Sequence, residues 1–147
     1  MILGVGNDFR GDDAAGLHAA RRLREKLPQA RVIERDGDLA GAIECWTGED
    51  MVIVIDAVFS GAEAGTIHRF EAHARPLSSR FFRGSTHSFG VAEAIELARA
   101  LDRLPRRLIV YGIEGASFTT GDSLSPRVAE SVEEVVIRVV EEVGRNA

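Results

Sequence analysis

One stretch of the sequence decides the fold: Met51-Val52-Ile53-Val54-Ile55-Asp56. Five consecutive apolar residues are typical of a strand that is covered on both faces, because a half-exposed strand alternates apolar and polar residues. Such strands occupy the middle of parallel sheets that carry helices on both sides. We therefore expect an α/β fold in which this stretch is a central strand that ends at Asp56.

The rest of the chain alternates between strand and helix patterns. We expect further strands at residues 1–5 and 31–36, of which the second is weaker, a buried strand at 108–113 and an alternating edge strand at 66–71. Helical patterns cover residues 12–27, 39–46, 91–101 and 126–143, whereas residues 72–86 have no clear period and are expected to form a long loop. Without an internal repeat or a linker, the 147 residues are expected to form a single domain.

Two helix starts carry specific signals. Ser88 precedes the helix that begins near Val91, and we expect it to be the N-cap. Ser125 and Pro126 combine an N-cap residue with proline at the first helical position, which predicts the start of the last helix.

Composition and charge narrow the classes of function. The chain is 45% hydrophobic and 28% charged, as soluble globular proteins are, and its net charge of −5 argues against a nucleic-acid partner. No apolar run approaches the roughly 20 residues that span a bilayer, and we expect no signal peptide because the sequence does not open with a basic region and a long apolar stretch. We expect a cytoplasmic monomer without a membrane partner. Because Cys45 is the only cysteine, a metal would need carboxylate, imidazole or backbone ligands.

Acidic residues follow the expected strands at the edge where open parallel sheets bind their ligands. Asp12 and Asp13 come after the first strand, Asp56 after the central one and Glu114 after the last. Carboxylates that gather there repel one another unless a cation or a proton lies between them, which favours a metal site. The structural alternative makes Asp12 an N-cap, Asp13 a first-turn acid of the helix and Asp56 a turn residue.

Two further features have competing interpretations. His87 lies in a loop just before a helix, where a lone histidine is more often structural or exposed than a ligand. Gly4-Val5-Gly6 after a strand is similar to the start of a dinucleotide-binding fingerprint. However, Phe9 occupies the third glycine position, and Asp12 and Asp13 would place negative charge where a pyrophosphate docks. A nucleotide-binding module is therefore the weaker reading.

Four sequence blocks together resemble the hydrogenase maturation protease family. The blocks are Gly4-Val5-Gly6-Asn7 with Arg10-Gly11-Asp12-Asp13 and Gly16, Asp56-Ala57, Ser85-Thr86-His87, and Tyr111-Gly112-Ile113-Glu114. Their order and spacing agree over nearly the whole chain. The resemblance implies a single domain with a twisted, mostly parallel five-stranded sheet, one antiparallel edge strand and helices on both faces.

The resemblance also implies an activity. It implies an aspartate- or metal-dependent endopeptidase that removes the C-terminal extension of a nickel-iron hydrogenase large-subunit precursor after nickel insertion. Carried over by position, the catalytic and metal-contacting residues fall on Asp13, Asp56 and His87. Asp13 stands where the family often has glutamate, which keeps the charge but shortens the reach. Gly115 stands where other members have proline, which suggests a subgroup with a different hydrogenase partner.

Two carboxylates and an imidazole suit nickel, or zinc in its place. The ion can belong to the enzyme, or it can be the nickel already inserted in the precursor. We favour the second alternative as the recognition mechanism and leave the attacking group open. A non-enzymatic nickel-delivery or assembly factor would use the same three ligands, and it is the alternative function.

Overall fold

The computed structural model describes residues 1–36, 39–78 and 89–146, and in this part of the chain five strands form one sheet. The strands are β1 (Ile2–Val5), β2 (Val32–Arg35), β3 (Met51–Val58), β4 (Ile67–Glu71) and β5 (Arg107–Glu114). Their order is β2-β1-β3-β5-β4; the first four run parallel, and β4 pairs with β5 antiparallel. The expected mostly parallel sheet with one antiparallel edge strand is confirmed.

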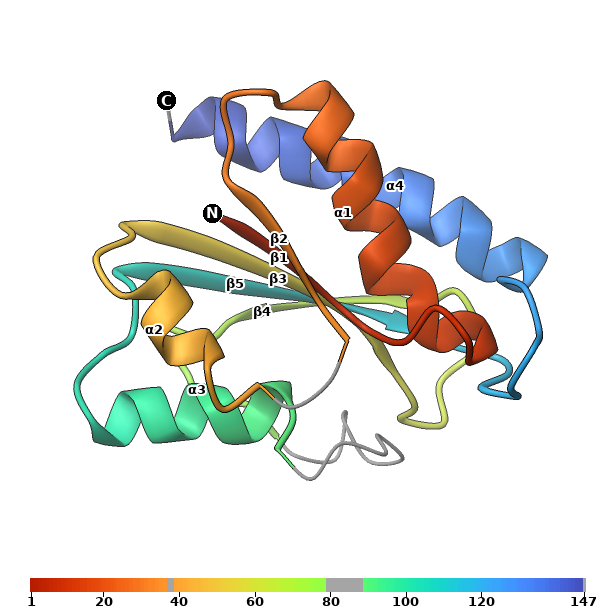
Figure 1. The fold of residues 1–147 in the computed structure, drawn as a ribbon, viewed down its shortest axis with the longest axis horizontal. Coiled ribbons are helices and arrows are strands. Elements are labelled where there is room, and N and C mark those ends of the chain that lie inside the picture. Colours follow the sequence, from red (N-terminus) through yellow and green to blue (C-terminus); the bar gives the residue numbers. More distant parts are fainter. Residues whose placement is uncertain (37–38, 79–88, 147) are drawn as a thin grey trace.

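Helices cover both faces of this sheet (Figure 1). One face carries α1 (Ala15–Lys26) and α4 (Pro126–Arg145), and the other carries α2 (Ala42–Trp46) and α3 (Val91–Ala100). Along β3, Ile53 and Ile55 pack in the core under α1 and α4, while Val52 and Val54 belong to the core under α2 and α3. Two cores therefore explain the unbroken apolar run. No helix in the described ranges is both long and apolar enough to cross a membrane.

Two glycines let α1 lie unusually close to the sheet. A Cβ atom at Gly16 would lie 2.2 Å from the carbonyl oxygen of Ile55 and 2.4 Å from that of Val5. A Cβ atom at Gly4 would lie 2.5 Å from the Cβ of Ala20. Any side chain at these positions would push the helix away from the strands. The close approach places the start of α1 against the carboxyl ends of β1 and β3.

Two element boundaries differ from the expectation. The central strand does not end at Asp56 but continues to Val58, because β5 runs beside it in register from Asp56 opposite Gly112 to Val58 opposite Glu114. Asp56 is therefore a strand residue rather than a turn residue. The helix expected from residue 12 begins as a short 3₁₀ helix, η1 (Gly11–Ala14), and α1 starts at Ala15.

The predicted helix starts have mixed outcomes. The N-cap of α3 is Gly90, whose N–H donates to the Glu93 carboxylate at 3.1 Å, whereas Ser88 was expected and lies outside the described residues. Ser125 is the N-cap of α4 and Pro126 follows it, as predicted. The Ser125 hydroxyl nevertheless donates to Asp12 instead of capping its own helix. Of the expected loop, residues 72–78 form turns and irregular structure.

Candidate active site

Asp56 is buried near the carboxyl end of the central strand. It lies between β1 and β5 in the sheet, and only 8% of its surface is exposed. Burial raises the pKa of Asp56 well above its ordinary value, and the nearby Asp13 carboxylate raises it further, while a hydrogen bond from the Ala57 N–H acts in the opposite direction. The two aspartates therefore interact electrostatically across the sheet edge.

Asp13 reaches this position because η1 folds back over the end of β1. Its carbonyl oxygen accepts the Asn7 N–H at 3.1 Å, and a Cβ atom at Gly6 would lie only 2.0 Å from the same oxygen. Glycine at position 6 is thus required for η1 to fold against the strand. The Asp13 side chain is also buried, with 8% of the residue exposed, and its Oδ2 lies 3.9 Å from Nη1 of Arg10.

The buried carboxylates of Asp13 and Asp56 interact electrostatically, and this determines what can bind at the carboxyl edge of the sheet. The Asp13 charge disfavours the ionised form of Asp56, so a proton or a cation between the two carboxylates lowers the free energy of the pair. Oxygen donors of this kind suit a divalent cation. The sequence pointed to these two residues because acidic residues follow the strands at this edge of the sheet. In the structure the two carboxylates interact electrostatically.

Asp12, grouped with them from the sequence, has a different environment. It is fully buried and accepts four hydrogen bonds, from the N–H groups of Ala116, Ser117 and Ser125 and from the Ser125 hydroxyl, at 2.7 to 3.0 Å. Burial alone would raise the pKa of Asp12, but these donors outweigh it and hold the pKa below its ordinary value. Asp12 fastens the segment between β5 and α4 to η1, so it is neither an N-cap nor free for an ion.

Glu114 also fastens a loop. It is 1% exposed and accepts the Ser60 N–H at 2.8 Å and the Ser60 hydroxyl at 2.5 Å. Nε2 of His68, on β4, lies 3.2 Å from the same carboxylate. The sequence assigned His68 no role, and no local signal indicates one, because the contact joins residues 46 positions apart.

His87, the third predicted site residue, lies outside the described residues together with Ser85 and Thr86. Within residues 1–36, 39–78 and 89–146, no group of three or more His, Cys, Asp or Glu side chains is placed to hold a metal ion. The described part of the candidate site is therefore the pair formed by Asp13 and Asp56.

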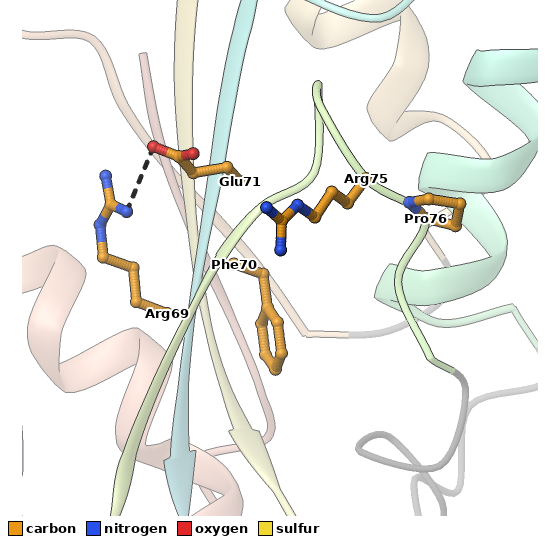
Figure 2. Close-up of a pocket in the computed structure, with 5 residues that line it drawn as sticks. All are labelled: Arg69, Phe70, Glu71, Arg75 and Pro76. Carbon is orange, nitrogen blue, oxygen red and sulfur yellow. Dashed lines mark hydrogen bonds and ion pairs between the residues drawn. The ribbon is translucent and has the colours of Figure 1, made fainter.

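A separate pocket lies beside the edge strand β4 (Figure 2). Its volume is about 370 Å³, and its lining residues are Arg69, Phe70, Glu71, Arg75 and Pro76. Arg69 pairs with Tyr111 and Glu71 with Ile109 in the sheet register, whereas Gly112 is the β5 residue opposite Asp56. This pocket thus extends toward the amino-terminal half of β5, away from the acidic pair.

Comparison with known proteins agrees with the resemblance noted in the sequence. The family model for hydrogenase maturation protease matches residues 18–142, a range that includes Asp56 and His87 but not Asp13. The chain is 28% identical over 146 residues to the hydrogenase 2 maturation protease of Escherichia coli K12, covering 95% of this chain and 87% of that protein. It is 29% identical over 136 residues to the hydrogenase expression/formation protein HupD of Thiocapsa roseopersicina. That alignment covers 90% of this chain and 62% of the relative.

Solved structures share the fold over nearly the full length. An endopeptidase from Escherichia coli superposes with a TM-score of 0.80 at 25% identity, covering 99% of this chain and 93% of that one. The [NiFe] hydrogenase maturation protease HybD from Thermococcus kodakarensis gives 0.71 at 27% identity, with 97% and 96% covered. Since the family model matches residues 18–142, which is most of the chain, this protein belongs to the hydrogenase maturation protease family.

Proposed function

We propose that this protein is a peptidase that removes the C-terminal extension of a nickel-iron hydrogenase large-subunit precursor after nickel has been inserted. Family membership supports peptide-bond hydrolysis during hydrogenase maturation. The observation that carries the nickel-dependent part is the buried pair of Asp13 and Asp56, which interact electrostatically at the carboxyl edge of the sheet. We assign the activity to a cytoplasmic monomer.

In this proposal Asp13, Asp56 and His87 contact the nickel ion that the precursor carries. Burial and mutual repulsion make the two aspartates a poor place for two negative charges, and a substrate-borne cation offsets both terms. A precursor without nickel offers no such compensation. The ion can then align the scissile peptide bond in the same binding event, which is a large source of rate enhancement.

Mass spectrometry of the large subunit tests this function. The purified protein is incubated with a nickel-loaded precursor, and the mass of the large subunit is followed over time. A peptidase shortens the subunit by the mass of its extension. A nickel-delivery or assembly factor would leave the mass of the loaded precursor unchanged, and that result would contradict the proposal.

A further inference from the structure

Two aromatic side chains at the same edge are exposed to an extent that the fold does not explain. Phe9 is 77% exposed and Phe59 is 53% exposed. Phe9 belongs to the loop between β1 and η1 that leads to Asp13, and Phe59 follows directly after β3, the strand of Asp56. Large aromatic side chains in water contribute nothing to a core, while burying them against a partner is strongly favourable. Both rings therefore belong to segments that adjoin the candidate active-site residues in the chain.

The loops that carry these rings are fastened to the body of the protein. The Phe9 carbonyl accepts the Gly121 N–H at 2.9 Å, and the Phe9 N–H donates to Oδ1 of Asn7 at 2.9 Å. The Phe59 ring meets Phe118 edge to face at 5.6 Å, and Phe118 in turn packs on the core beneath α1 and α4. Presenting aromatic side chains from held loops lowers the entropy that a partner must overcome on binding.

Charged groups in the same loops are already paired within the chain. Asp8 accepts two hydrogen bonds from the Arg21 guanidinium, and Glu63 forms an ion pair with Arg127. The acidic side chains of these two pairs are therefore already neutralised within the protein. A partner that matches this surface must offer apolar area rather than a charged patch, since interface cores are rich in aromatic side chains and poor in charge.

We propose that Phe9 and Phe59 dock the folded large-subunit precursor through an apolar patch on that protein. The inference rests on the proposed function, because a precursor whose peptide bond reaches Asp13 and Asp56 must cover the loops that follow β1 and β3. Docking through these rings holds the precursor while its extension enters the site. It also separates binding affinity, which depends on the rings, from cleavage, which depends on the acidic pair.

The test compares Phe9→Ala and Phe59→Ala with two matched controls, Leu101→Ala and Ile137→Ala. The control residues are 53% and 52% exposed, and they lie at the end of α3 and on α4. Each phenylalanine variant is expected to raise KM for the nickel-loaded precursor about tenfold with kcat unchanged, the scale of truncating an interface aromatic. Both controls should stay within about twofold of the wild type, as surface changes away from an interface do. Thermal unfolding verifies that all four variants are folded.

Three outcomes would overturn the docking proposal while the wild type still cleaves. The first is an unchanged KM in both phenylalanine variants. The second is an equal rise in the controls. The third is a dimer of the wild type that Phe9→Ala converts to monomers in sedimentation, which would assign the surface to a second copy of the chain. Failure of the wild type to cleave any loaded precursor would instead contradict the proposed function.

Salt dependence gives an independent readout. Because the rings are apolar and Asp8 and Glu63 are already paired, wild-type KM should change less than about threefold between low and high ionic strength, since salt screens exposed charges but not apolar contacts. A steep rise of KM with salt would mean that charge rather than the aromatic rings docks the precursor, and it would overturn the proposal.

Discussion

Asp12 and Asp56 are two buried aspartates at the same edge of one sheet, and their surroundings shift their pKa values in opposite directions. Four hydrogen-bond donors surround Asp12 and hold its pKa down in spite of burial. Burial and the nearby charge of Asp13 both disfavour the ionised form of Asp56, so its pKa is raised. A carboxylate with a full set of donors is a structural element, whereas one that burial and a like charge destabilise can gain from a cation. The contrast separates the residue that builds the edge from the residue proposed to act there.

The largest expected effect is on activity. Asp56→Asn or His87→Ala should lower the rate of precursor processing by about 10³-fold, or roughly 4 kcal/mol in activation free energy, because each removes a group that we propose to contact nickel. The rate is measured by mass spectrometry at equal concentrations of folded enzyme. Asp50→Asn, an exposed position just before β3, is the matched control and should process normally. Near-normal cleavage by either site variant would remove that side chain from the proposed mechanism.

The next largest effect is on stability. Asp12→Ala should lower the free energy of unfolding by about 3 kcal/mol, because it leaves three backbone N–H groups, at positions 116, 117 and 125, without their acceptor. Urea unfolding measures the loss. Asp8→Ala, which removes an exposed partner of Arg21, should cost less than about 1 kcal/mol. A loss for Asp12→Ala no greater than for Asp8→Ala would show that the donors around Asp12 do not hold the loop.

The pH dependence of stability sharpens the contrast further. The folded state binds the Asp56 proton more tightly than the unfolded chain, so this group lowers the free energy of unfolding as pH rises above its ordinary pKa of 3.8. Asp56→Asn should therefore be more stable than the wild type at neutral pH, by about 1–2 kcal/mol, and the gain should vanish in acid. Asp12 has the opposite sign: its contribution is present above 3.8 and is lost as pH falls through its lowered pKa.

Urea unfolding of the wild type, Asp56→Asn and Asp12→Asn from acid to neutral pH measures this difference. The two variants should diverge from the wild type in opposite directions as pH rises. Parallel pH profiles for the two variants would contradict the assignment of opposite pKa shifts to these aspartates.

The smallest expected effect is on the loop that Glu114 holds through Ser60. Glu114→Gln keeps an acceptor for Ser60 but removes the charge, so it should cost about 1 kcal/mol in the free energy of unfolding. Thermal unfolding measures the loss. A cost equal to that of Asp12→Ala would mean that charge, rather than the number of donors, determines how firmly these loops are held.

Much of the fold follows from the sequence because its signals are local. Residues 51–55 predict a doubly covered strand, and the two cores packed against β3 are the physical reason. The convergence of Asp13 and Asp56 follows from the rule that parallel strands direct their carboxyl ends to one edge. The length of β3 does not follow, because its pairing with β5 as far as Glu114 depends on residues far along the chain.

The role of Asp12 was missed for the same reason. Its donors come from residues 104 to 113 positions away, so the sequence shows only an acid before a helix, and an N-cap is then the natural expectation. The contact between His68 and Glu114 likewise depends on the antiparallel pairing of β4 with β5. The catalytic roles of Asp13, Asp56 and His87 stay predictions, with His87 outside the described residues.

A comparison of two precursors shows whether Asp13 and Asp56 recognise the nickel that the precursor carries. Metal-free enzyme is mixed with equal concentrations of nickel-loaded and nickel-free precursor, and the mass of the large subunit is followed in both. Only the loaded precursor should be shortened, because its nickel ion compensates the charges of Asp13 and Asp56. Equal cleavage of the two precursors would contradict it.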